Sequence, residues 1–309
     1  MQDPVYAQIT EKKRPSLFAA RGLLLLACAG LWLSSLLELA LPEGGGVLLN
    51  AAYYLPFIAL PLLLYARRHP GLSDALRLNP PPLGWTVALA LLALLSVFVA
   101  SALSALWAGM LDALGLRSPG ALAAPASERD LAIAIISMAA LPAVCEELLF
   151  RGFALSAWET RGTWYAIGVT SALFALLHGN LYGLPNYLLV GAVAGYATWA
   201  LDSVYAGIVY HTVYNAACLV IAHLLAGEGD AEVALDLVMV VNIALRAAMQ
   251  ILTMLLLLAL LAQRARHANI APIPRIRRPL SPRERAMLWA AVGAMVASTA
   301  IVAALATLI

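Results

Sequence analysis

Long apolar runs separated by short polar breaks extend through the whole chain, and this pattern predicts membrane-spanning helices. A helix needs about 20 apolar residues to cross the hydrocarbon core at a rise of about 1.5 Å per residue. We count nine such runs, of which the fifth is the shortest, and therefore expect an all-α, polytopic transmembrane bundle of about nine helices. The runs are Leu17–Leu41, Val47–Ala66, Leu83–Leu111, Leu131–Trp158, Trp164–His178, Leu184–Leu201, Val204–Leu225, Leu237–Ala262 and Ala286–Ile309.

The first run is predicted to be a retained span and not a cleaved signal. It is longer than the apolar region of a signal peptide, which has about 7–15 residues, and no small-residue cleavage site follows it. The composition agrees with a membrane protein, since 63% hydrophobic and 12% charged residues lie outside the range of soluble globular domains. The expected partners are membrane lipid and a peptide or protein substrate, with no nucleic acid.

The positions of the basic residues predict the orientation. With a cytoplasmic N-terminus, nearly all of the 19 Lys and Arg residues fall in inner loops or at inner helix ends, and the outer loops hold only Arg117 and Arg129. This asymmetry satisfies the positive-inside rule. We therefore expect a multi-pass protein of the inner (cytoplasmic) membrane, with the N-terminus inside and the C-terminus outside.

Two adjacent acids, Glu146 and Glu147, lie near the end of an apolar run that begins at Leu131. Charged groups are costly in the hydrocarbon core, so such a pair indicates a functional site. Glu147 and Arg151 are four residues apart and share a helix face, whereas Glu146 is rotated by about 100°. We expect an ion pair between Glu147 and Arg151, and an unpaired Glu146 that serves as a general base. The alternative is an ion network that only joins helices.

Three polar side chains lie in later apolar runs and are candidate partners of Glu146. His178 follows Phe174 by one turn, and His211 and Asn215 share one face of their run. Two converging donors suit the stabilisation of a developing oxyanion. Taken singly, each residue is as well explained by hydrogen bonds between helices. Counting from the inner helix ends places Glu147, His178 and His211 at depths of roughly 16, 21 and 10 Å, compatible with one shared site.

Together these residues suggest hydrolysis by a water that Glu146 activates, with His178 orienting the water. His211 and Asn215 would then hold the carbonyl oxygen. A cysteine nucleophile is not expected, because two neighbouring carboxylates disfavour the thiolate of Cys145.

Three motifs resemble those of the type II CAAX prenyl endopeptidase and bacteriocin-processing family, known as CPBP or Abi. The segment from Glu146-Glu147 to Arg151 resembles its Glu-Glu-x-x-x-Arg signature, Phe174 to His178 its Phe-x-x-x-His motif, and His211 to Asn215 its His-x-x-x-Asn motif. The resemblance implies glutamate-type intramembrane proteolysis without a required metal or other cofactor. In this scheme Glu146 and His178 activate water, and His211 and Asn215 form the oxyanion side.

The resemblance covers roughly Leu131 to Leu225. It predicts a catalytic core at residues 131–225, flanked by transmembrane helices at 1–130 and 226–309, the latter with an Arg/Pro-rich inner loop from Arg264 to Arg285. Family members cleave prenylated tails, process peptides or sorting signals, or confer bacteriocin immunity. The substrate, and whether it carries a prenyl group, therefore does not follow from the resemblance.

Three alternatives remain open at this point. Glu146, His178 and His211 could ligate zinc in a metal-dependent version of the same hydrolysis, although no His-Glu-x-x-His spacing supports it. The protein could instead be a non-catalytic scaffold or an immunity factor. It could also be a proton-coupled carrier, although no inverted repeat is visible.

A further polar stripe recurs every four residues at Asn242, Arg246 and Gln250. Such a stripe within a span is expected to face protein or water. Arg246 is a candidate contact for a substrate carboxylate, and the alternative is a structural pair with Glu38.

Overall fold

The computed structural model describes residues 14–40, 46–116, 124–226 and 237–273, and, between 281 and 297, all positions except 284, 287, 291, 294 and 295. Within these residues the regular elements are helices. In chain order they are α2 (Leu17–Ala40), α3 (Gly46–Tyr54), η1 (Leu55–Ala59), α4 (Leu60–Arg68), α5 (Leu72–Ala75), α6 (Leu83–Ala113), α7 (Glu128–Ala134), η2 (Ile135–Ala140), α8 (Leu141–Glu147), η3 (Leu148–Ala154), α9 (Leu155–Trp158), η4 (Glu159–Arg161), α10 (Thr163–Leu177), α11 (Leu184–Leu201), α12 (Val204–Leu225) and α13 (Leu237–His267).

The predicted all-α, polytopic architecture is confirmed. Six stretches of the described residues are long and apolar enough to cross a membrane: Leu17–Ser34, Leu49–Arg68, Leu83–Ala113, Glu128–Arg161, Val204–Leu225 and Leu245–His267. The predicted fifth span is the shorter apolar helix α10. The predicted sixth span is α11, which forms a helix over the expected residues but is not among the six. The predicted last span, Ala286–Ile309, falls mostly outside the described residues.

Two of the long spans are interrupted by π-helical turns. In these turns the N–H of Leu60 bonds to the carbonyl of Leu55, that of Leu141 to Ile136, and that of Leu155 to Phe150. Proline lacks an N–H and disturbs the regular helical ladder, and Pro56 and Pro142 lie at or beside two of these turns. Such turns occur often at functional sites, and two of them flank the segment that carries Glu146 and Glu147.

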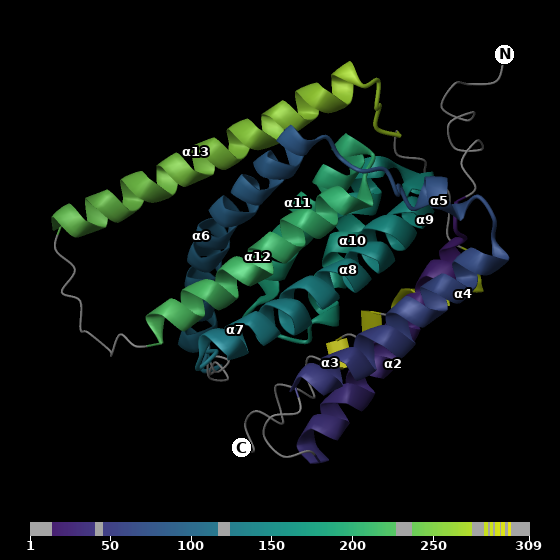
Figure 1. Ribbon diagram of the computed structural model, residues 1–309, viewed down its shortest axis with the longest axis horizontal. Coiled ribbons are helices and arrows are strands. Elements are labelled where there is room, and N and C mark those ends of the chain that lie inside the picture. The colour runs from purple at the N-terminus through teal and green to yellow at the C-terminus, as the bar shows by residue number, and fades with distance from the viewer. Residues whose placement is uncertain are drawn as a thin grey trace.

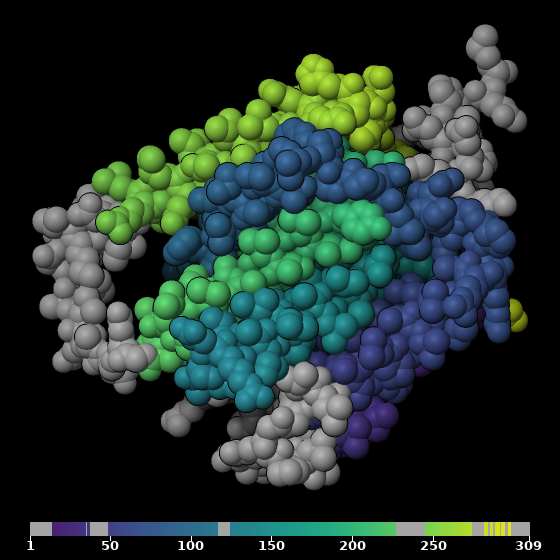
Figure 2. Space-filling model, in the orientation of Figure 1, coloured from purple at the N-terminus to yellow at the C-terminus, as the bar shows by residue number. Residues whose placement is uncertain are grey.

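The central bundle consists of α6, α10, α11 and α12, with the segment from α7 to α9 packed beside them (Figure 1). On the face shown in Figure 2, α12 lies between α6 and the segment that contains α7. The pair α2 and α3 forms a separate layer, which contacts the segment from α7 to α9 through α8 and η3. The long helix α13 packs on α6 and α11 along the outside.

Candidate active site

The predicted pair of Glu147 and Arg151 is present. Nη1 of Arg151 lies 2.9 Å from Oε1 of Glu147, and neither side chain is exposed. The guanidinium also donates from Nη2 to the carbonyl of Gly191 at 3.0 Å, and it lies 4.4 Å above the ring centre of Phe174. Removing either partner of a buried pair would leave the other charge uncompensated. These contacts hold the side chains of Glu147 and Arg151 in one arrangement.

Small residues make room for this pair. A Cβ atom added to Gly207 on α12 would lie 2.6 Å from Oε2 of Glu147 and 2.9 Å from Oγ1 of Thr198. A Cβ added to Gly191 would lie 3.2 Å from Nη2 of Arg151. Glycine at these positions lets α12 approach the buried carboxylate and α11 the guanidinium this closely.

Glu146 is buried, with 4% of its surface exposed, and no cation pairs with it within the described residues. This agrees with the prediction that it is the unpaired acid. One of its oxygens is nevertheless held, because the hydroxyl of Tyr54 donates to Oε1 at 2.6 Å. The other oxygen, Oε2, has no hydrogen-bond partner among the described residues. The two acids thus have different partners.

His178 caps the C-terminus of α10, and its ring is oriented by two contacts. Nδ1 lies 2.8 Å from the carbonyl of Phe174, and the ring stacks on Tyr187 at 3.9 Å between centres. A carbonyl only accepts, so Nδ1 must carry the proton. A neutral His178 ring therefore offers Nε2 as an acceptor. Glu146, His211 and Arg151 are close enough to act on His178 electrostatically.

His211 is buried on α12, and its Nδ1 lies 3.0 Å from Oε1 of Glu147. An ionised carboxylate only accepts, so Nδ1 donates to Glu147. Nε2 of His211 can then donate to an oxyanion only when the ring is doubly protonated. The sequence did not predict this contact between α12 and α8.

Phe174 is the common neighbour of both histidines. Its ring centre lies 4.7 Å from that of His178 and 5.5 Å from that of His211, both in edge contact. Phe150 contacts it edge-on from η3 at 5.3 Å. Phe174 thus links the rings from α10 and α12 to the segment that follows the acid pair.

Asn215 and Arg246 are less closely connected to this cluster. Asn215 lies one turn beyond His211 and is half-buried, and its side chain makes no hydrogen bond with the described residues. Arg246 is exposed on α13, while the side chains of Asn242 and Glu38 lie outside the described set. A substrate contact through Arg246 stays a prediction.

The candidate zinc ligands do not form a metal site in the part of the chain that the structure describes. No three His, Cys, Asp or Glu side chains there are grouped so that they could hold one ion. The available side chains therefore do not fit the zinc-dependent alternative.

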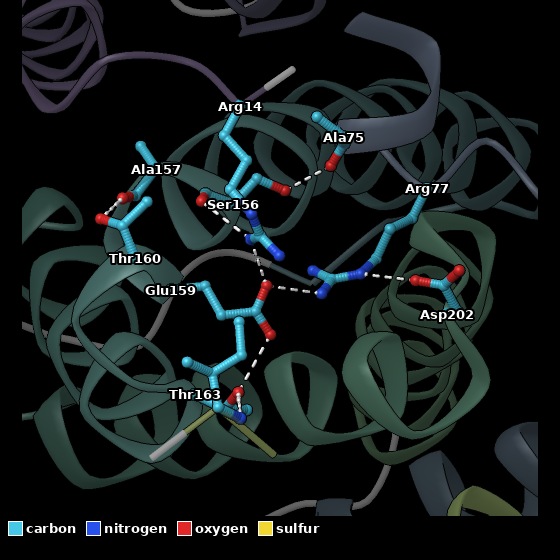
Figure 3. A network of polar contacts seen from close by, with 10 residues as sticks. Arg14, Ala75, Arg77, Ser156, Ala157, Glu159, Thr160, Thr163 and Asp202 are labelled. Atoms are coloured by element: carbon cyan, nitrogen blue, oxygen red, sulfur yellow. Dashed lines mark hydrogen bonds and ion pairs between the residues drawn. The ribbon is translucent and has the colours of Figure 1, made fainter. Parts of the chain in front are cut away.

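A second polar network, which the sequence analysis did not predict, lies at the end of the α7–η4 segment (Figure 3). Oε2 of Glu159 receives Nη1 of Arg14 at 2.6 Å and Nη2 of Arg77 at 2.7 Å, and Nε of Arg77 binds Asp202 at 2.9 Å. Thr163 donates to Glu159 and accepts from the backbone N–H of Ile273. The network joins five separate segments of the chain.

This network borders a cavity of about 470 Å³ that also contacts Trp199 and Asn79. Burial disfavours the charged form of Arg77, but the carboxylates of Glu159 and Asp202 outweigh burial and raise the pKa of its guanidinium above the ordinary value. Glu159 lies roughly 20 Å along the helical segment from Glu146. The cavity is therefore distinct from the acid and histidine cluster.

Comparison with known families supports the motif analysis. Residues 128–217 match the family model described as type II CAAX prenyl endopeptidase Rce1-like. This match over 90 of the 309 residues supports membership of the CPBP family. The matched residues include both glutamates, Arg151, both histidines and Asn215, and they exclude Tyr54, Arg77 and Arg246. No curated protein and no solved structure matched the chain.

Proposed function

We propose that this protein is a glutamate-type intramembrane endopeptidase of the CPBP family, with its catalytic core at residues 131–225 and flanking transmembrane helices at 1–130 and 226–309. The observation that carries the proposal is the grouping around Phe174. Its ring contacts both His178 and His211, and His211 bonds to the carboxylate beside Glu146. This grouping supports a shared site to which three helical segments contribute an acid and two imidazoles.

In the proposed reaction, Oε2 of Glu146 and Nε2 of His178 bind one water. Glu146 removes a proton from this water, and the water oxygen attacks the carbonyl carbon of the scissile peptide bond. The carbonyl oxygen becomes negatively charged and accepts hydrogen bonds from Nε2–H of a protonated His211 and from the Asn215 carboxamide. The C–N bond then breaks, and the leaving amine takes the proton from Glu146. The products are an amine and a carboxylic acid, which releases its proton to solvent and becomes a carboxylate.

Glu147 and Arg151 take no proton in this scheme. Glu147 holds His211 through Nδ1, and Arg151 balances the charge of Glu147. The proposed substrate is a membrane-associated peptide or a C-terminal protein tail that is cut near the cytoplasmic surface of the inner membrane. Whether a prenyl group is required is an outcome of the test.

The test is a cleavage assay with purified protein in lipid vesicles, using a panel of peptides with and without a prenylated C-terminal cysteine. Glu146→Gln is compared with Glu128→Gln, which changes an exposed acid at the start of α7. We expect wild type and Glu128→Gln to cleave the same peptide and Glu146→Gln to leave it intact. Equal cleavage by all three, or no cleavage of any peptide by wild type, would reject the proposal in favour of another mechanism or a non-catalytic role.

A further inference from the structure

Tyr54 contacts the candidate site from a part of the chain that the family match does not cover. It is the last residue of α3, and its side chain is buried beside α8. The π-helical turn Leu55–Ala59, which contains Pro56, follows directly. Its hydroxyl lies 2.6 Å from Oε1 of Glu146. The flanking helices thus supply a polar group to the proposed general base.

This contact makes the two oxygens of Glu146 unequal. Oε1 accepts a hydrogen bond from Tyr54, while Oε2 has no partner among the described residues. A carboxylate turns easily about its last side-chain bond, because that torsion has broad minima. A short hydrogen bond to one oxygen fixes the carboxylate plane and leaves the other oxygen available.

We propose that Tyr54 is a positioning residue, which holds Oε1 of Glu146 so that Oε2 is the oxygen presented to the attacking water. This inference rests on the proposed function, since it assigns Tyr54 a part in that reaction. Tyr54 acts through Glu146 and does not touch the reacting atoms. Its hydrogen bond is charge-assisted when Glu146 is ionised, which is the state that the general base requires.

The adjacent Tyr53 is a matched control. Its ring lies 4.6 Å from that of Tyr54 and is equally buried, but its hydroxyl has no hydrogen-bond partner among the described residues. Replacing either tyrosine by phenylalanine removes one buried oxygen from the same helix and keeps the ring. Only the change at position 54 removes a contact with Glu146.

The experiment compares kcat and KM of wild type, Tyr54→Phe and Tyr53→Phe on a cleaved peptide, and the melting temperature of each variant. We expect Tyr54→Phe to lower kcat by about tenfold to a hundredfold, the change that loss of one hydrogen bond to a charged group corresponds to. KM should stay within about twofold of wild type, since substrate binding does not involve this bond. Tyr53→Phe should leave both constants within about twofold.

A third variant, Tyr54→p-aminophenylalanine, keeps the ring and restores a donor at the same place. We expect it to recover most of the lost kcat, which a purely structural role of the hydroxyl would not explain. Equal kcat for the Tyr54→Phe and Tyr53→Phe enzymes, or a loss confined to KM, would overturn the inference. The proposed function would survive that result if wild type cleaves and Glu146→Gln does not. An inactive wild type would reject both the proposed function and the role of Tyr54.

Discussion

Nδ1 of His211 on α12 lies 3.0 Å from Oε1 of Glu147 on α8, the same oxygen that Arg151 binds at 2.9 Å. One carboxylate oxygen thus holds an imidazole and a guanidinium. The bond fixes which His211 nitrogen faces the carboxylate and leaves Nε2 as the nitrogen available to a substrate. Glu147 therefore both neutralises Arg151 and orients the ring of His211.

Removing the charge of Glu147 should destabilise the protein and abolish activity. Glu147→Gln leaves the buried guanidinium of Arg151 without a counter-charge, and we expect a loss of about 3–5 kcal/mol in the free energy of unfolding. Thermal unfolding of the purified protein in detergent measures it. The double change Glu147→Gln with Arg151→Met removes both charges and should recover part of the stability but no activity. An unchanged melting temperature in the single variant would contradict the account.

A methyl group at position 207 should displace the same carboxylate. In Gly207→Ala the new Cβ would lie 2.6 Å from Oε2 of Glu147, so the side chain must move away from Arg151 and His211. We expect a destabilisation of about 1–3 kcal/mol and a large loss of cleavage. Gly168→Ala on α10 is the control, because its Cβ would meet nothing within 4 Å. That change should stabilise by up to about 1 kcal/mol through helix propensity, and equal behaviour of the two variants would refute the steric argument.

The oxyanion role of Asn215 predicts a specific kinetic pattern. Asn215→Ala removes one donor, and such a loss typically lowers kcat by about 100- to 1000-fold. KM should change little, because the donor acts on charge that develops only in the transition state. Steady-state kinetics on the cleaved peptide measure both constants. A large rise in KM at constant kcat would instead place Asn215 in substrate binding.

Cleavage should not depend on a divalent metal. The described residues hold no grouping of three His, Cys, Asp or Glu side chains that could bind one ion. We expect full activity after dialysis against a chelator and no increase on addition of zinc. Activity that disappears on chelation and returns with zinc would show that the hydrolysis is metal-dependent.

The network around Glu159 should contribute stability and not catalysis. Glu159→Gln leaves Arg14 without this carboxylate and Arg77 with only Asp202, with an expected cost of about 3–5 kcal/mol. Asp74→Asn, which changes an exposed acid beside the same cavity, should have little effect on unfolding. At a temperature where both variants are folded, kcat should equal that of wild type. A selective loss of kcat in Glu159→Gln would mean that this end of the segment acts on the site.

The sequence was sufficient for the bounds of several spans and for a contact along one helix. Apolar run length predicted the bounds of α2, α6 and α12 closely, because span length is set by the bilayer. The four-residue spacing of Glu147 and Arg151 predicted their ion pair, which the structure confirms.

Contacts between distant helices could not be predicted in the same way. The bond from Tyr54 to Glu146 depends on how α3 packs against α8, and that geometry is absent from local spacing. A weak signal existed, since a buried tyrosine hydroxyl usually finds a partner. Likewise, nothing in the sequence pairs Arg77 with Glu159, because the loop after α5 meets the end of the α7–η4 segment only in the folded chain.

The most direct test of the central claim is cleavage in water enriched in oxygen-18, followed by mass spectrometry of the two products. The account predicts that wild type places one labelled oxygen in the new carboxyl terminus, and that folded Glu146→Gln gives no labelled product. Cleavage by Glu146→Gln at the wild-type rate with the same label would contradict the claim that Glu146 activates the water.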